Sequence, residues 1–327
     1  MSTVTLKEKL ARLDKTPAPA SQTQINRGAR PDLSRLLPGS EKANSRGCFW
    51  SIRKEFDLSL RHGLFALKDL LDHKPEHLQY AAKNPALGGF ALDRLLFFDT
   101  ETTGLSGGVG TLAFIVGLGY FEGGRFVIEQ FFLRRFDEER ALLHEFMQHL
   151  QRTAAGNGAL ISFNGKAYDM PLIHNRAVIH RSSDLPAGIS HIDLLYAARR
   201  LWKNILTSCS LATLESEILQ VRRRGDIPSH LIPEIYFRYL RTSDPRPLIP
   251  VLHHNQADIL SMVTLLTLIL RLFANDGAVD SVPIDRIAMG RIHEDLPGSD
   301  RAPFVIVRAL PLVYVLPPIP QPQISRP

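Results

Sequence analysis

The chain has 327 residues, of which 44% are hydrophobic and 22% are charged, so it has the composition of a globular protein with one large core or two smaller ones. Its two cysteines, Cys48 and Cys209, exclude a disulfide framework and a zinc site built from a cluster of thiolates. The net charge of +6 suits a polyanionic partner such as nucleic acid but does not require one.

The start of the chain lacks the apolar core of a signal peptide, and its apolar stretches are interrupted by glycine, charged or polar residues. We therefore expect a cytoplasmic protein that makes no contact with a membrane. The sequence indicates no protein partner. The short basic runs 134–135 and 222–224 are typical of solvated surface.

The chain divides into four predicted segments: a mobile basic N-terminal arm (1–46), a small N-terminal appendage (47–90), a main domain (91–275) and a Pro-rich C-terminal tail (276–327). Within the appendage, alternating apolar residues predict a strand over 48–56. The leucine spacing that follows predicts a helix over 60–71.

The main domain begins with the apolar run Leu95–Phe98, which predicts a strand buried on both faces. Asp99 and Glu101 follow directly. Because residues i and i+2 of an extended chain point to the same side, these two carboxylates face one spot at the end of the strand. Such a pair suits a hard divalent cation, although an isolated Asp-x-Glu pattern is more often ordinary surface.

Two apolar, β-branched runs come next, over 111–121 and 125–134, and the short Glu-Gly-Gly link between them is typical of a hairpin. Leucine and phenylalanine spacing then predicts a helix over 137–151. A further buried strand is expected over 159–163. Strands in hairpin order, a helix and a returning strand together predict a mixed α/β domain.

The strand over 159–163 runs into SFNGKAYDMPLI, which places Asp169 at the start of a helix. Asp169 is either the cap of that helix or a ligand of a metal held by the first strand. The Asn164-Gly turn brings backbone close to the same crevice, and Lys166 adds a cation. Three more helices are expected over 192–202, 211–219 and 231–240, with Asp193 as a cap of the first.

The apolar stretch LIPVLHHNQADILSMVTLLTLILRLF predicts a long helix that carries Asp258. A carboxylate within so apolar a helix is costly unless it is paired or binds a metal. His254 lies one turn before Asp258 on the same face, whereas His253 is about 140° away. The geometry therefore favours His254, unless the helix begins after both histidines.

The order Asp99, Glu101, Asp169, Asp258, with a histidine just before the last acid, resembles the DEDD exonuclease group of the ribonuclease H-like superfamily, which includes proofreading 3′ to 5′ exonucleases. More specifically, FFDTETTG, SFNGKAYDMPLI, IDLLYAARRLW and HNQADILSM together resemble the YprB-type ribonuclease H-like domain, over about 95–272. The resemblance implies an α/β fold whose mixed β-sheet combines antiparallel hairpin strands with a parallel strand and is flanked by helices.

The resemblance also implies a set of site residues. Two Mg²⁺ or Mn²⁺ ions would be held by Asp99, Glu101, Asp169 and Asp258. Related exonucleases with a histidine base carry it five residues before the last Asp, and those with a tyrosine carry that residue four before. Both positions are histidine here, His253 and His254, so the resemblance implies that the base is His254 or His253. The expected substrate contacts are Thr102, Asn164 and Lys166.

These features predict a metal-dependent 3′ to 5′ exonuclease that hydrolyses phosphodiester bonds of DNA or RNA, acting on a single strand or a free 3′ end. Two alternatives stay open: a nucleic-acid-binding or scaffold domain of the same fold without turnover, and an endonuclease of that fold.

Overall fold

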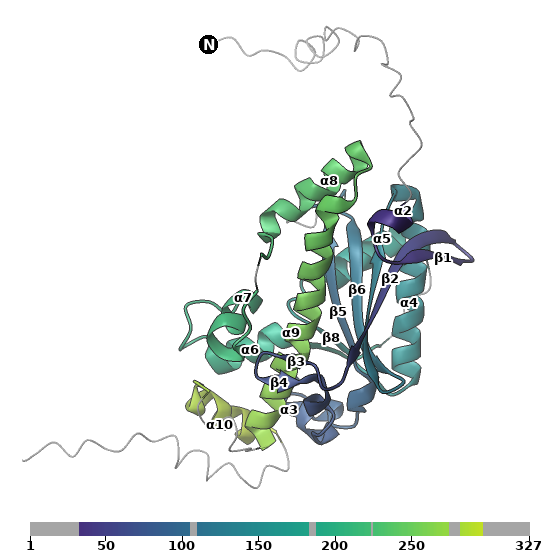
Figure 1. The fold of residues 1–327 in the computed structure, drawn as a ribbon. Coiled ribbons are helices and arrows are strands. Elements are labelled where there is room, and N and C mark those ends of the chain that lie inside the picture. The colour runs from purple at the N-terminus through teal and green to yellow at the C-terminus, as the bar shows by residue number, and fades with distance from the viewer. Residues whose placement is uncertain (1–32, 105–109, 183–187, 224, 275–281, 297–327) are drawn as a thin grey trace, which may run out of the picture.

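The structure is a computed structural model that describes residues 33–104, 110–182, 188–223, 225–274 and 282–296. One mixed sheet forms its centre, and the long helix α9 (Ile249–Ala274) crosses the face of that sheet (Figure 1).

Within the described residues the central sheet has seven strands in the order β1-β2-β7-β6-β5-β8-β9. Their bounds are Ser40–Asn44 (β1), Gly47–Asp57 (β2), Leu96–Thr102 (β5), Ala113–Glu122 (β6), Arg125–Phe132 (β7), Leu160–Ser162 (β8) and His191–Asp193 (β9). A small second sheet pairs β3 (Arg61–His62) with β4 (Phe65–Ala66).

The strand directions confirm the predicted mixed sheet. β5, β6 and β7 form an antiparallel meander, and β8 lies parallel to β5 on its other side. β9, parallel to β8, was not predicted as a strand, because its last two residues, Ile192 and Asp193, were assigned to the start of the next helix. Short strands carry too few residues to show an alternating pattern.

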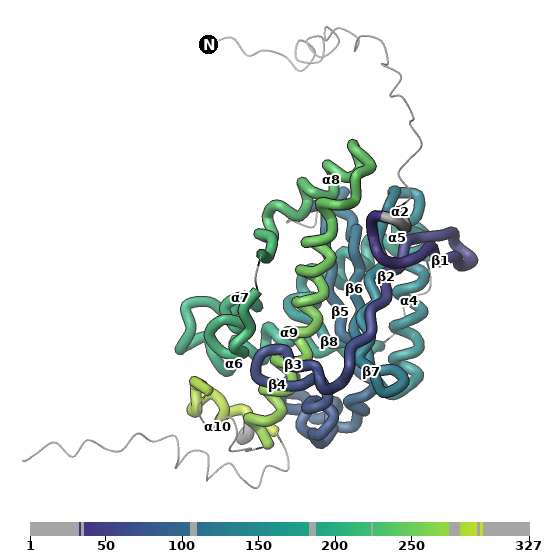
Figure 2. The backbone as a smooth tube through the Cα atoms, viewed as in Figure 1, coloured from purple at the N-terminus to yellow at the C-terminus, as the bar shows by residue number. Residues whose placement is uncertain are grey.

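The boundaries predicted for the N-terminal segments are wrong. β1 and β2 belong to the main sheet, and β2 pairs antiparallel with β7 along eight residues from Trp50 to Asp57 (Figure 2). Part of the predicted mobile arm and part of the predicted appendage are therefore integral to the main domain. Backbone pairing across a sheet joins distant segments, and segment composition does not reveal it. Residues 1–32 lie outside the described part of the chain.

The helix predicted over 60–71 is also wrong. This stretch forms the β3–β4 hairpin followed by a 3₁₀ turn at Leu67–Leu70. At Gly63 the backbone has φ 62°, and a Cβ atom there would lie 2.2 Å from the carbonyl oxygen of Leu219. The chain must turn sharply at this point to pack against Leu219, so the regular leucine spacing buries side chains without forming a helix.

Helices cover both faces of the sheet. Because side chains of a strand alternate, Phe98 of β5 packs in a core with α4 and α5, whereas Phe97 packs in a second core with α3, α6 and most of α9. The helix bounds are Leu33–Leu36 (α2), Leu78–Ala82 (α3), Glu139–Ala155 (α4), Asp169–Ile179 (α5), Leu194–Trp202 (α6), Leu211–Leu214 (α7), Ile232–Thr242 (α8) and Arg286–Glu294 (α10).

The described part of the predicted C-terminal tail packs on the main domain. The indole Nε1 of Trp202 donates to the carbonyl oxygen of Pro283 (2.8 Å), and the backbone nitrogen of Asp285 donates to the carbonyl oxygen of Leu201 (3.1 Å). Ile292 of α10 is buried in the core. The start of this segment is therefore part of the fold, and 275–281 and 297–327 lie outside the described residues.

The stretch Arg246–Ala274, which includes α9, is long and apolar enough to cross a membrane when length and composition alone are considered. The most apolar window of this stretch is 78% buried inside the protein. A core helix passes the same test of length and composition, and the burial is that of a core helix.

Two glycines of β6 allow α9 to approach the sheet closely. A Cβ atom at Gly117 would lie 2.1 Å from Oδ1 of Asn255, and one at Gly119 would lie 2.4 Å from Cγ2 of Ile259. Both distances are far below van der Waals contact, so any larger residue would push the helix away. The glycines thus fix where α9 sits over the strands.

We predict that Gly117→Ala lowers the free energy of unfolding by about 1–3 kcal/mol, the usual cost of inserting a methyl group into a packed interior. Denaturant titration of the purified variants measures this directly. Gly89→Ala is the matched control, because a Cβ atom at Gly89 would meet no atom within 4 Å. Equal stability of the Gly117 and Gly89 variants would contradict the close approach.

Candidate metal centre

Asp99 and Glu101 lie on β5 and point to the face covered by α9, two and four residues after Phe97 on the same side of the strand. Asp99 is half-buried, and Glu101 is only 8% exposed. The alternation expected from the sequence therefore brings both carboxylates to one place.

Asp169 reaches the same region from the first residue of α5. Its Oδ1 accepts a hydrogen bond from the hydroxyl of Thr100, the residue between the two acids of β5. Gly165 makes room for this arrangement, since a Cβ atom there would lie 2.6 Å from Oγ of Ser162 and 3.3 Å from Oδ2 of Asp169. Because β8 pairs parallel to β5, the loop between β8 and α5 lies at the same end of the sheet as the end of β5.

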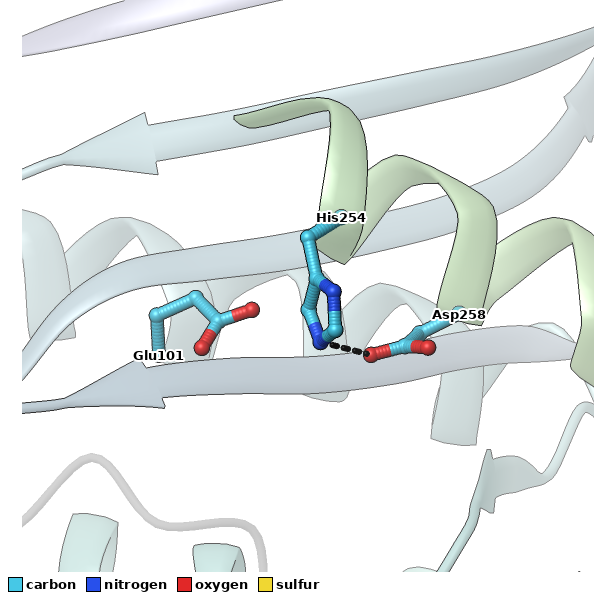
Figure 3. Close-up of side chains that lie close together, drawn as sticks. All are labelled: Glu101, His254 and Asp258. Carbon is cyan, nitrogen blue, oxygen red and sulfur yellow. Dashed lines mark ion pairs between the residues drawn. The ribbon is translucent and has the colours of Figure 1, made fainter. Parts of the chain in front are cut away.

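Asp258 and His254 project from α9 toward Glu101 (Figure 3). Nε2 of His254 lies 3.5 Å from Oδ2 of Asp258, one helical turn along. Because α9 begins at Ile249, both histidines lie inside the helix and the comparison of their faces holds. The structure places His254 in the cluster, whereas His253 is exposed.

The acids are close enough to act on one another electrostatically. Burial raises the pKa of Asp99 well above its usual value, and the charges of Asp258, Glu101 and Asp169 raise it further. Burial likewise raises the pKa of Glu101, with further contributions from Asp258 and Asp169. Burial raises the pKa of Asp169 to about 6, although the hydrogen bond from Thr100 acts in the opposite direction. A bound cation would offset the repulsion between these carboxylates.

Two amide side chains that were not predicted from the sequence hold this arrangement. Asn255 donates from Nδ2 to Oδ2 of Asp99 (2.8 Å), and Gln130 donates from Nε2 to Oδ1 of Asn255 (2.8 Å) and to the carbonyl oxygen of Leu252 (2.8 Å). Asp99, Gly117 and Gln130 lie in one row across β5, β6 and β7. The sequence does indicate that these amides have partners, because each lies within an apolar stretch, as Asp258 does, and a buried polar group is costly unless it is hydrogen-bonded.

Arg223 was not predicted as part of the site either, and its interpretation as solvated surface is wrong. Its side chain is 14% exposed and forms ion pairs with Asp258 and Glu215. Burial opposes the charge of Arg223, but the Asp258 and Glu215 carboxylates outweigh it and raise its pKa. Arg134 is similarly covered, at 17% exposed, and pairs with Glu138 (2.7 Å). A run of arginines in the sequence does not show which of them forms an ion pair with a buried acid.

The residues expected to contact substrate have different positions. Asn164 lines the groove that also contains Asp99, His254 and Asp258. The side chain of Lys166 is exposed, while that of Thr102 donates to the carbonyl oxygen of Gly104 (2.9 Å).

Asp193 is the cap of α6, as predicted, since Oδ1 accepts from the backbone nitrogen of Leu195 (3.0 Å). It also accepts from the backbone nitrogens of Asn164 (2.7 Å) and Lys166 (3.0 Å). Asp193 thereby holds the loop that leads to Asp169.

The donor set fits a hard divalent cation. Ligand atoms of Glu101, His254 and Asp258 all lie within 4.8 Å of one another. In the described residues Oε1 of Glu101 is buried and has no hydrogen-bond partner, a costly state for a carboxylate oxygen unless a cation binds it. Carboxylate oxygens are the preferred ligands of Mg²⁺ and Mn²⁺.

The comparison with known families agrees with this geometry. The profile of the RNase_H superfamily matches residues 96–270, more than half of the 327-residue chain. The chain belongs to the RNase H superfamily. Members of this superfamily generally act on nucleic acids. The match covers β5, α5 and most of α9, the elements that carry the acids.

The RNase H superfamily domain is also similar to the uncharacterized protein YprB of Bacillus subtilis (strain 168). The two are 37% identical over 214 residues, which is 64% of this chain and 50% of YprB. The chain therefore matches about half the length of that relative.

We predict that Asp99→Asn raises the melting temperature of the metal-free protein at pH 7 and that the gain shrinks toward pH 4. The folded protein holds protons on the acid cluster more tightly than the unfolded chain, so stability is lost as pH rises from about 4 through the raised pKa values. A carboxyl pKa that is one pH unit higher in the folded protein than in the unfolded chain costs about 1.4 kcal/mol of stability at neutral pH.

Differential scanning fluorimetry in EDTA at several pH values tests this, and Mn²⁺ should reverse the order of wild type and variant. Comparing the two at each pH cancels the opposite contribution of His62, His149 and His191, whose pKa values burial lowers to about 4. Asp93→Asn, at an exposed acid, is the control. A gain that is independent of pH would show that the acids do not repel one another.

Proposed function

We propose that this chain is a metal-dependent 3′ to 5′ exonuclease that hydrolyses phosphodiester bonds of DNA or RNA. The observation that carries the proposal is the gathering of four carboxylates and one imidazole, from β5, α5 and α9, at one end of the sheet in an RNase H superfamily fold. The order of these residues along the chain, as in DEDD exonucleases, supports an exonuclease acting from the 3′ end.

The metal ligands in this proposal are Asp99, Glu101, Asp169 and Asp258, all carrying oxygen donors. Two Mg²⁺ or Mn²⁺ ions bound by them would supply Lewis acidity, activating water and stabilising negative charge on the leaving oxygen. The protein's own contribution is to hold the ligands in place. Asn255 orients Asp99, Thr100 orients Asp169, and Arg223 orients Asp258.

His254 is the proposed general base. Its Nε2 faces Asp258 and Glu101, where it would take the proton from the attacking water. Its side chain is 11% exposed, so the imidazole is held in the groove and not free in solvent. An imidazole suits this step because its usual pKa lies near neutral pH. His253, which is exposed, has no part in the proposed chemistry.

We predict that Asp99→Asn and Glu101→Gln lower the rate of phosphodiester hydrolysis by at least about 100-fold, because each removes charge from the metal site while keeping the shape of the side chain. The assay is degradation of 3′- and 5′-end-labelled single-stranded DNA and RNA with Mn²⁺, with Mg²⁺ and with EDTA. A ladder that shortens from the 3′ end, requires metal and is absent in both variants is the expected result.

The same metal conditions, applied to a closed circular strand and to a binding measurement, decide between the alternatives. Cleavage of a closed circular strand would overturn exonuclease action in favour of an endonuclease, since an exonuclease requires an end. Tight binding of both nucleic acids without cleavage under any metal condition would favour a binding module. Asp93→Asn serves again as the control, and circular dichroism of each variant verifies that loss of activity is not loss of fold.

A further inference from the structure

Asp226 lies beside His254 although it is 28 residues away in the sequence and belongs to none of the four motifs. Oδ1 of Asp226 is 2.8 Å from Nδ1 of His254. The Asp226 side chain is 27% exposed and lines the same groove as Asp99 and Asp258. The imidazole is therefore held on one side by Asp226 and presents its other nitrogen to the acid cluster.

This contact determines which nitrogen of His254 carries the hydrogen. A carboxylate only accepts hydrogen bonds, so a neutral imidazole in this contact carries its hydrogen on Nδ1 and leaves Nε2 free to accept a proton. Nη1 of Arg223 is also near Nδ1, at 3.4 Å. The carboxylate contact has the length of an ordinary hydrogen bond, whereas the arginine contact is longer than the usual range, so Asp226 and not Arg223 sets the hydrogen position.

Asp226 is itself fixed from two sides. Its Oδ1 accepts from the backbone nitrogen of Ile227 (2.9 Å), and its Oδ2 pairs with Nη1 of Arg223 (3.2 Å). Burial alone would raise the pKa of Asp226, but the hydrogen bond with His254 and the charge of Arg223 help to bring it below the usual value. It is thus a fixed, charged acceptor.

We propose that Asp226 is a positioning residue that holds His254 in the Nδ1–H form with Nε2 directed at the metal centre, an inference that rests on the proposed hydrolysis. In that reaction an O–H bond of water breaks and its proton moves to Nε2, while the water oxygen bonds to phosphorus. The P–O bond to the leaving 3′ oxygen breaks, and that oxygen takes a proton from solvent. The cation formed on His254 is then stabilised by Asp226.

Asp226→Asn tests this with little change in shape. Its amide can donate to Nδ1 and so favour the form in which Nε2 carries the hydrogen and cannot accept a proton. The expected result is a loss of about 10- to 100-fold in kcat, with KM and the Mn²⁺ concentration for half-maximal activity unchanged. Asp137→Asn, at an acid that is 69% exposed and pairs with Arg135, is the matched control.

A double-mutant cycle with His254→Ala separates positioning from general damage to the site. If Asp226 acts through His254, then Asp226→Asn has no further effect on kcat in the His254→Ala background. An equal loss in both backgrounds, or wild-type kcat in the single variant, would overturn the inference while leaving the proposed function intact. An inactive wild type under every metal condition would instead contradict the proposed function.

The hydrogen position can be measured without activity. Nitrogen-15 NMR of the full chain with labelled histidine, recorded at pH 8 and assigned with His254→Ala, distinguishes the two neutral forms of the ring. We expect the Nδ1–H form in the wild type and a change toward the Nε2–H form in Asp226→Asn. An Nε2–H form in the wild type would overturn the inference whatever the enzymatic result.

Discussion

The close contact between α9 and β6 is the constraint on which the site depends. Gly117 and Gly119 leave no side chains on the sheet surface where the helix crosses, so Asn255 and Ile259 rest almost on the backbone. The helix therefore packs close enough to the sheet for Asn255 to hydrogen-bond Asp99. Asp258, about one turn further along the helix, lies near the acids of β5. Since the interior is closely packed, an added methyl group at either glycine displaces both helical residues together.

The fold holds the four acids close together although their negative charges repel one another. Four carboxylates that repel one another lie where an apolar helix meets the sheet, and burial together with this repulsion raises the pKa values of Asp99 and Glu101. Neighbouring polar groups partly offset the repulsion. Hydrogen bonds link His62 to Ser261 (2.8 Å) and Ser261 to Glu215, and the ion pairs of Arg223 extend this chain to Asp258. Such strain is typical of functional sites, where local stability is given up for chemistry.

This polar chain also gives the N-terminal segment a role in the site. His62 belongs to the β3–β4 hairpin, which lies beside α9, and the hydroxyl of Thr264 in α9 donates to its carbonyl oxygen (2.9 Å). Glu215 lies in the π-helical turn after α7. Segments that differ in composition are thus joined through a buried network, which explains why composition alone divided the chain in the wrong places.

The sequence by itself determined the elements whose pattern is local: the strand that ends in Asp99 and Glu101, the hairpin of β6 and β7, the helix that starts at Asp169, and the long helix with His254 and Asp258. Alternation and helical period record which side chains share a face, so these residues could be named in advance. Only the tertiary structure decided that β1 and β2 join the sheet and that Arg223, Asn255, Gln130 and Asp226 surround the acids. Their positions follow from strand pairing and helix packing between distant segments, interactions that leave no periodic trace in the sequence.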